Sequence, residues 1–313
     1  MVDKQPYPPL LILLGPTAIG KTDLAMRLAQ KFDGEIIGAD SRQIYKYMDI
    51  GTAKPTPDQL AAIPHHVVDF IAPDDTFTLA DFKDKALAAI VDITSRGKLP
   101  MLVGGTGQYL TCIEEGWSIP RVPPNPTLRE QLNTEADEIG VDAFHAKLEA
   151  VDPEAAAKIH PNNVRRVVRS LEVYLETGTP ISVLQRKKPH PYSMRTLGLK
   201  MERDPLYARA DKRVDIMIDH GFVTEVENLL NMGYDRTLRS MSALGYREMA
   251  AHILDDTPLE EAIQLTKFST HDFIRSQEVW FRGHDNGTIW HNIESLNVEE
   301  IIQSTAHWLE EIT

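Results

Sequence analysis

The sequence predicts an α/β fold, in which a parallel sheet is flanked by helices and a helical domain is inserted into the chain. Three observations lead to this prediction. Short apolar segments alternate with helical segments over the first third of the 313 residues. A glycine-rich loop separates the first apolar segment from the first helical segment. Proline-rich stretches then flank a region of helical pattern, as linkers between domains do.

Four apolar segments in the first third are the expected strands. Leu10–Leu14 and Gly34–Ala39 are apolar runs of strand length, and "HHVVDFI" (65–71) and "LPMLVGG" (99–105) are two further candidates. Helices are expected between them, and the longest, Leu79–Ser95, repeats its apolar residues at helical spacing. Because strands that alternate with helices pair in parallel, this region predicts a parallel sheet.

The middle of the chain predicts the inserted domain. A proline-rich linker, "SIPRVPPNPT" (118–127), precedes helical patterns that run from Leu128 to about Leu184. A second linker follows in "KKPHPYS" (187–193). We therefore predict a core made of residues 1–112 and 197–313, with residues 113–196 as a helical insertion domain.

Capping and stop signals place individual elements in and after this insertion. "DPEAAAKI" is an expected helix start capped by aspartate, and "NNVRRVVRSLEVYLETG" is an amphipathic helix that ends at its glycine. "RTLGLKM" (195–201) is the expected strand that returns to the sheet. The next helix is expected to have Asp204 as N-cap and Pro205 as its first residue, and the rest of the chain is mostly helical.

Composition excludes several classes of protein. The formal net charge of −13 argues against indiscriminate nucleic-acid binding, although a local basic groove remains open. The one cysteine, Cys112, excludes an internal disulfide and a thiolate metal cage. No apolar run is long enough for a membrane span, and the N-terminus lacks a signal core, so we expect a cytoplasmic protein. Basic residues cluster at 165–169, 186–188 and 267–282, and each cluster is equally compatible with a solvated helix face.

The glycine-rich loop is the strongest local signal. Gly15–Thr22 reads G-x-x-x-x-G-K-T between an apolar strand and a helix, which is the phosphate-binding P-loop pattern and makes the core a P-loop core. Backbone N–H groups of such a loop point at an anion, Lys21 adds a positive charge, and Thr22 can bind Mg²⁺. Such loops usually hold ATP or GTP.

Other features argue against nucleotide hydrolysis. The strand at 99–105 runs into glycines without the aspartate that helps to hold Mg²⁺ in nucleoside triphosphatases. The chain also lacks the N-K-x-D pattern that reads guanine. The acid at a strand end near the loop is Asp40, within "GADSRQIYKYMDIGTAKP". A carboxylate there fits a ligand site at the carboxyl edge of the sheet, and it fits a capped turn as well.

A series of longer motifs then becomes specific. In order, the chain contains "GPTAIGKT", "GADSRQIYKYMDIGTAKP", "PHHVVD", "GGTGQYL", "ADKRVDIMIDHGFVTEV", "ALGYREM" and "SQEVWFR". Together they resemble the tRNA dimethylallyltransferases, from about residue 10 to residue 282. The resemblance implies that the loop holds dimethylallyl diphosphate and that no ATP is consumed. The dimethylallyl group passes to the exocyclic amine of the adenosine 3′ of the anticodon, and pyrophosphate leaves.

The resemblance also implies roles for residues. Asp40 takes the general-base position, while Thr17, Arg213 and Mg²⁺ on Thr22 stabilise the leaving diphosphate. The implied diphosphate-binding residues are Gly15, Pro16, Thr17, Ala18, Ile19, Gly20, Lys21 and Thr22. The implied tRNA-binding residues are Asp40, Ser41, Arg42, Gln43, Thr106, Arg129, Arg165, Arg166, Val167, Val168, Arg169, Gly245, Tyr246 and Arg247.

Several of these residues have simpler readings. Arg213 and its helix neighbour Arg209 fit a surface ion pair, and Thr106 fits a plain turn. Tyr45 and Tyr246 are candidates for stacking on bases, and aromatic residues at such places are also common in cores. His65 and His66 have no partners at metal spacing, and we interpret them as strand-edge residues.

Some positions depart from the family pattern. Arg165 stands where glutamine is usual, and His271, Asp272 and Ser276 stand where arginine is common. The chain lacks a C-terminal Cys/His pattern, which favours a bacterial-type enzyme without a zinc finger. We expect a monomer. The alternatives are an adenylate isopentenyltransferase that acts on free AMP, ADP or ATP, and a nucleotide switch that acts on a protein partner.

Overall fold

The computed structural model describes residues 7–188 and 190–312. The chain forms two compact units. The first, the core unit, runs up to Glu114 and resumes at Pro191, and the second, the helical unit, covers Glu115–His190. The predicted boundary at 196/197 differs from this division. The strand that returns to the sheet and pairs with its first strand already begins at Ser193.

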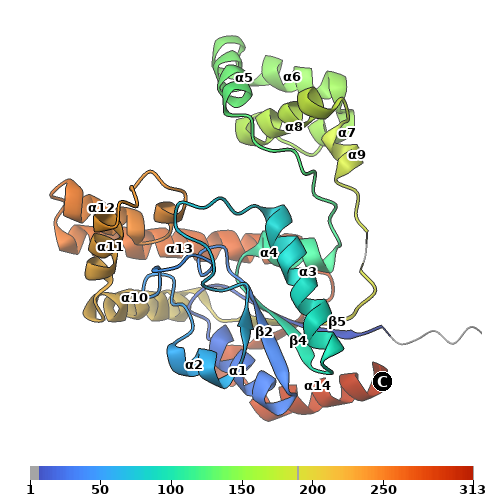
Figure 1. Cartoon of the computed structure of the whole chain (residues 1–313), viewed down its shortest axis with the longest axis vertical. Coiled ribbons are helices and arrows are strands. Elements are labelled where there is room, and N and C mark those ends of the chain that lie inside the picture. Colours follow the sequence, from blue (N-terminus) through green and yellow to red (C-terminus); the bar gives the residue numbers. More distant parts are fainter. Residues whose placement is uncertain (1–6, 189, 313) are drawn as a thin grey trace, which may run out of the picture. The chain divides into compact units, whose positions relative to one another are not determined.

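The core unit is built on a six-stranded parallel sheet, which confirms the predicted fold class (Figure 1). The strand order is β3-β2-β4-β1-β5-β6. The strands are β1 Pro9–Leu14, β2 Gly34–Ala39, β3 His65–His66, β4 Leu99–Gly104, β5 Ser193–Lys200 and β6 Ile289–Asn292. Because all neighbours are parallel, the carboxyl ends of β1, β2 and β4 lie at one edge of the sheet, where such folds bind ligands.

Helices cover both faces of the sheet. Successive strand residues point to opposite faces, and Leu11 and Leu13 share a buried cluster with residues of α1 (Lys21–Lys31), α10 (Arg203–Asp219) and α14 (Val298–Ile312). On the other side, α3 (Leu79–Ser95) and α4 (Gly107–Glu114) pack against the central strands (Figure 1).

Three further helices complete the core unit and carry parts of the site. These are α11 (Phe222–Asn231), α12 (Tyr246–Leu254) and α13 (Leu259–Gly283), and a short α2 (Pro57–Ala62) lies before β3. The long α13 packs against α10, α12 and α4. It therefore runs past several segments that are distant in sequence.

The helical unit has its own apolar core. Its helices are α5 Pro126–Ile139, α6 Val141–Val151, α7 Pro153–Ala156, α8 Val164–Thr177 and α9 Ile181–Leu184. Phe144, Leu148 and Val167 are fully buried in its centre. The predicted stop of α8 is confirmed, since Gly178 caps it with a φ of 68°. Pro189 of the predicted second linker lies outside the described residues.

The predicted aspartate cap of "DPEAAAKI" is confirmed, since the side chain of Asp152 accepts from the N–H of Ala155 at the start of α7, a helix of four residues.

Three predicted details are wrong. The third strand has only two residues, because Val67 and Asp69 take positive φ angles of 60° and 55° that end it. Strand β6 was not expected, since it is short and lies at the sheet edge. The N-cap of α10 is Glu202, which puts Pro205 within the first turn, where a missing N–H costs no helical hydrogen bond.

Across residues 7–188 and 190–312, no helix combines the length and apolar character that crossing a membrane requires.

Candidate active site

Glycines shape the loop between β1 and α1. Gly15 has a φ of 154°, and a Cβ there would lie 2.8 Å from the carbonyl oxygen of Leu199. Gly20 precedes the first helical residue with a φ of 100°, which side chains rarely allow. The two glycines of the motif are therefore needed for their positive φ angles. These angles turn the chain from the end of β1 into the N-terminus of α1.

Lys21 is half-buried, and its hydrogen-bond partners carry no charge. Its Nζ donates to the carbonyl oxygens of Gly15 at 2.9 Å and Pro16 at 2.7 Å. Burial lowers the pKa of Lys21 to about 7, an effect that Asp40 opposes and Arg213 adds to. A bound anion would stabilise the protonated form of Lys21.

Arg213 reaches the same loop from α10. Its Nη1 donates to Oγ1 of Thr17 at 3.3 Å, and burial lowers its pKa against the opposing attraction of Asp40. Arg209, one turn earlier, also faces the cavity described below. The surface ion-pair reading of Arg213 is therefore wrong, because its side chain points inward to the loop.

Asp40 lies directly after β2 and is fixed by local hydrogen bonds. Its Oδ1 accepts from the backbone N–H groups of Arg42 at 2.8 Å and Gln43 at 3.4 Å. These contacts are those of a capped turn. Asp40 also lines the cavity beside the loop, so the capped turn orients a carboxylate toward a ligand site.

A cavity of about 260 Å³ brings these groups together. Its polar lining includes Thr17, Lys21, Thr22, Asp40, Gln43, Arg209 and Arg213. Its apolar lining includes Ile36, Val68 and Val103. A space lined by cations, a carboxylate and apolar side chains suits a ligand that joins an anion to a small hydrocarbon group.

The loop residues divide between the cavity and its support. Thr17, Ala18, Gly20, Lys21 and Thr22 line the cavity. The other three predicted diphosphate-binding residues do not: Gly15 and Pro16 hold Lys21 through their carbonyl groups, and Ile19 is fully buried in the core.

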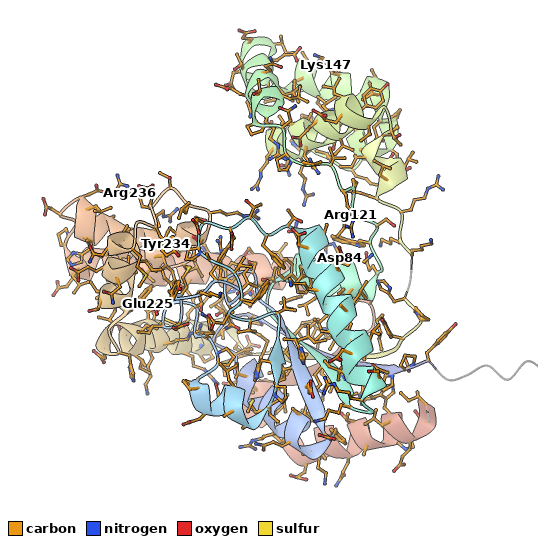
Figure 2. All side chains as sticks on the ribbon, viewed as in Figure 1. Asp84, Arg121, Lys147, Glu225, Tyr234 and Arg236 are labelled. Carbon is orange, nitrogen blue, oxygen red and sulfur yellow. The ribbon has the colours of Figure 1, made fainter. Side chains whose placement is uncertain are left out.

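The part of the cavity wall formed by Thr52 and Ala53 is held by two side chains. Gln43 Nε2 donates to the carbonyl oxygens of Thr52 at 3.1 Å and Ala53 at 3.0 Å, and both residues line the cavity. Glu225 on α11, labelled in Figure 2, holds the turn at residues 49–51, which comes directly before Thr52. Its carboxylate accepts from the N–H groups of residues 49, 50 and 51 at 2.9, 2.7 and 3.2 Å. Glu225 was not predicted as a site residue, because the motif that contains it does not show which distant segment it contacts.

Two aromatic predictions are wrong. Tyr246 is fully buried, its ring packs edge-on against Phe222, and its hydroxyl donates to Glu225 at 2.6 Å. Tyr45 is 3% exposed. Neither ring is available to stack on a base, so the core reading of both is correct. Gly245 is buried beside Tyr246.

The remaining predicted tRNA contacts of the core unit differ in accessibility. Arg247 is exposed, and its Nη2 pairs with Glu248 at 2.7 Å. Arg42 is partly buried, and its guanidinium donates to the carbonyl oxygen of Arg239 at 2.6 Å and to Ser242 Oγ at 3.2 Å. Ser41 and Thr106 are bonded to each other beside Asp40, at 3.0 Å.

In the helical unit, the predicted contact residues separate into three groups. Arg165 and Arg166 are exposed on α8. Val167 and Val168 lie in the apolar core of this unit. The prediction that they contact tRNA is therefore wrong for their side chains. The reason is the helical period, which turns two of five consecutive residues inward.

Arg129 and Arg169 form the third group, and both are paired with Glu172. Arg129 donates to the two Glu172 carboxylate oxygens at 2.8 and 2.9 Å, and Arg169 donates at 2.5 Å. The N–H of Asn125 donates to the same carboxylate at 2.8 Å. Burial alone would raise the pKa of Glu172, but these hydrogen bonds outweigh it and lower the pKa. Glu172 was not predicted, since a glutamate on an amphipathic helix normally faces water.

The described part of the chain contains no group of three or more His, Cys, Asp or Glu side chains that could hold a metal ion. His65 and His66 form the edge strand, as expected, and His66 Nε2 lies 2.8 Å from Glu35.

Comparison with known proteins identifies the family. The profile of the family described as IPP transferase matches residues 43–284. A tRNA dimethylallyltransferase of Roseiflexus castenholzii is 53% identical over 274 residues, which are 88% of this chain and 90% of that protein. One of Chloroflexus aurantiacus is 53% identical over 281 residues, 90% of this chain and 95% of that protein.

Solved structures agree. The full-length tRNA isopentenylpyrophosphate transferase of Bacillus halodurans has a TM-score of 0.72 at 39% identity, over 97% of both chains. A eukaryotic dimethylallyltransferase, captured acting on tRNA, has a TM-score of 0.80 at 26% identity, over 98% of this chain and 80% of that chain. The fold, the loop and these matches agree with the resemblance seen in the motifs: the chain belongs to the IPP transferase family.

Proposed function

We propose that this enzyme transfers a dimethylallyl group from dimethylallyl diphosphate to the exocyclic amine of the adenosine 3′ of the anticodon in tRNA. Pyrophosphate is the second product. The observation that carries the proposal is the cavity that Lys21, Arg213 and Asp40 line together with apolar side chains. Family membership supports the same reaction, since the relatives are named tRNA dimethylallyltransferases.

The chemistry assigns each group a task. The amine nitrogen attacks the first carbon of the dimethylallyl group, and the bond from that carbon to the bridging oxygen breaks. The electron pair of this bond goes to the diphosphate, where Lys21, Arg213 and the loop N–H groups stabilise the added charge. Asp40 takes the proton that the amine loses. Its Oδ1 is held by backbone N–H groups, which fixes the direction of the carboxylate.

Mg²⁺ fits this site as part of the proposal. The hydroxyl of Thr22 lines the cavity next to the loop, and a hydroxyl with phosphate oxygens and water is a donor set that Mg²⁺ prefers. When bound, the ion would neutralise part of the diphosphate charge. The protein side of the site is Thr22, with Lys21 and Arg213 supplying the remaining positive charge.

The alternative acceptor, free AMP, ADP or ATP, is not favoured. The relatives at 53% identity are named as enzymes of tRNA. The chain also has a folded helical unit, whose helix α8 exposes Arg165 and Arg166, and a free nucleotide does not require such a unit. A nucleotide switch is not favoured either, because β4 ends in glycine and lacks the acid that helps to hold Mg²⁺ in nucleoside triphosphatases. We place the activity in the cytoplasm and propose a monomer.

One assay separates these functions. The protein is incubated with labelled dimethylallyl diphosphate and Mg²⁺, without ATP or GTP, and with either unmodified tRNA or AMP. We expect label in tRNA, located by nucleoside mass spectrometry at the adenosine 3′ of the anticodon. Label in AMP alone would establish the alternative acceptor. A strict requirement for ATP, with ADP released in proportion, would make the loop a nucleotide site.

A further inference from the structure

A single amide side chain on α13 lies between the phosphate loop and the turn that follows β4. Gln277 is 5% exposed, and both ends of its side chain are bonded. Its Oε1 accepts from the N–H of Thr17 at 2.9 Å, and its Nε2 donates to the carbonyl oxygen of Gly105 at 2.8 Å. One side chain therefore joins the loop after β1 to the turn after β4.

The contact at Gly105 leaves no free space. A Cβ on Gly105 would lie 2.5 Å from Gln277 Nε2, 3.3 Å from the carbonyl oxygen of Gly15 and 3.5 Å from Lys21 Nζ. The turn therefore packs directly on the phosphate loop and on the amide that joins them. A change in the position of Gln277 is transmitted to both segments.

The residue after Gly105 holds the backbone on both sides of Asp40. Thr106 donates its N–H to the carbonyl oxygen of Ala39 at 3.1 Å. Its Oγ1 accepts from the N–H of Ser41 at 3.0 Å. A series of hydrogen bonds therefore connects the phosphate loop, through Gln277 and the turn, to the backbone on both sides of Asp40.

We infer that Gln277 is a positioning residue that sets the distance between the phosphate loop and the Asp40 carboxylate. This inference rests on the proposed transfer reaction, in which the loop holds the electrophile while Asp40 meets the nucleophile. A misplacement of about 1 Å in such a site can cost on the order of 10²-fold in rate. Gln277 acts through Thr17 and Gly105, so it affects the rate of transfer more than the affinity for tRNA.

The first test is Gln277→Met, which keeps the length of the side chain and removes both hydrogen bonds. Gln264→Met is the matched control, because Gln264 is exposed on the same helix. Steady-state rates are measured where circular dichroism shows both variants folded. We expect kcat to fall about 10²-fold in Gln277→Met, with the KM for tRNA within twofold of wild type. A kcat within threefold of wild type would overturn the inference.

The second test is the pH profile of Gln277→Glu. The introduced carboxylate still accepts from Thr17, but its other oxygen faces the carbonyl oxygen of Gly105. Protonation restores a donor at that place. We therefore expect the ratio of its kcat to that of wild type to rise as the pH falls, whereas the same ratio for Gln277→Met stays flat. A flat ratio for Gln277→Glu contradicts positioning through both bonds.

A binding measurement separates this inference from the proposed function. Calorimetry with Mg²⁺ and inorganic pyrophosphate reports on the loop without any transfer reaction. If wild type prenylates neither tRNA nor AMP, the proposed function fails. The role of Gln277 is then decided by whether Gln277→Met binds pyrophosphate about tenfold more weakly than Gln264→Met. Equal affinities reject it.

Discussion

Two pairs of cations, one pair in each unit, are held in opposite ways. In the core unit, Lys21 and Arg213 donate to carbonyl and hydroxyl oxygens, which carry no charge. In the helical unit, Arg129 and Arg169 both pair with the fully buried carboxylate of Glu172. The first arrangement leaves the positive charge without a directly bonded carboxylate, while the second ties both arginines to one carboxylate within the protein.

This difference shows that an arginine in a family motif is not by itself a contact to RNA. Arg165 and Arg166 are exposed on the same helix as Arg169. Arg169 also donates to the carbonyl oxygen of Val122 at 3.0 Å, which attaches the proline-rich segment to α8. The partner of each cation, rather than its residue type, separates ligand binding from structural support.

The largest expected effect lies in the core unit. Asp40→Asn removes the proton acceptor and keeps the shape of the turn, so turnover should fall about 10²–10⁴-fold. Binding of dimethylallyl diphosphate, followed by calorimetry, should persist, because the cations of the loop remain. Turnover within threefold of wild type at saturating substrates would remove Asp40 from the role of base.

Lys21→Ala should produce the next largest effect. Lys21 meets the diphosphate both before and during departure of the leaving group, so kcat should fall on the order of 10²-fold and the KM for dimethylallyl diphosphate should rise. Steady-state kinetics at saturating tRNA measure both constants. A rise in KM with an unchanged kcat would limit Lys21 to ground-state binding.

Glu172→Gln tests the structural side of the comparison. Breaking a buried ion pair costs about 3–5 kcal/mol, and because both arginines are about a third exposed we expect about 2 kcal/mol here. Hydrogen exchange should show faster opening of α5 and α8, with the core unit unaffected. Glu176→Gln, one turn further along α8 and exposed, is the control. Equal exchange in the two variants contradicts the assignment.

The pKa of Lys21 predicts a pH dependence of pyrophosphate binding. In the free enzyme this pKa is about 7, and a bound diphosphate raises it. Below pH 7 Lys21 is already charged, so affinity is insensitive to this group. Above pH 7 binding takes up a proton, and affinity should fall about fivefold from pH 7 to pH 8.

Lys21→Arg is the reference for this measurement, because arginine stays charged across the range. Ionisation of pyrophosphate affects both proteins equally and cancels in the ratio of their dissociation constants. A ratio that does not change between pH 6 and pH 8 would show that Lys21 is charged throughout.

The smallest effect is expected at the exposed arginines. Arg166→Ala should lower the salt slope of tRNA binding by about 0.7, the value for one contact to a single-stranded phosphate. Arg169→Ala should instead loosen the helical unit, since it leaves part of Glu172 unpaired. Filter binding over a range of salt concentrations gives the slopes. Identical slopes for Arg166→Ala and wild type would make this part of α8 a solvated face.

The sequence by itself determined the parts of this protein that depend on interactions between residues close together in the chain. The phosphate loop follows from glycines that need unusual φ angles, and the position of Asp40 follows from the end of an apolar strand. Helix α3 has the predicted bounds, because its apolar period and its threonine cap act within a few residues. The parallel sheet follows from the alternation of strands and helices.

Only the tertiary structure decided which side chains support the site. Gln277 bonds to a residue 260 positions away, and Glu225 to one 176 positions away, so the motifs that contain these two residues do not reveal their partners. The same holds for Tyr246 and Glu172, whose burial depends on helices that pack against them. Residue type and spacing are local properties, whereas burial and the identity of a partner are set by which distant segments the fold brings into contact.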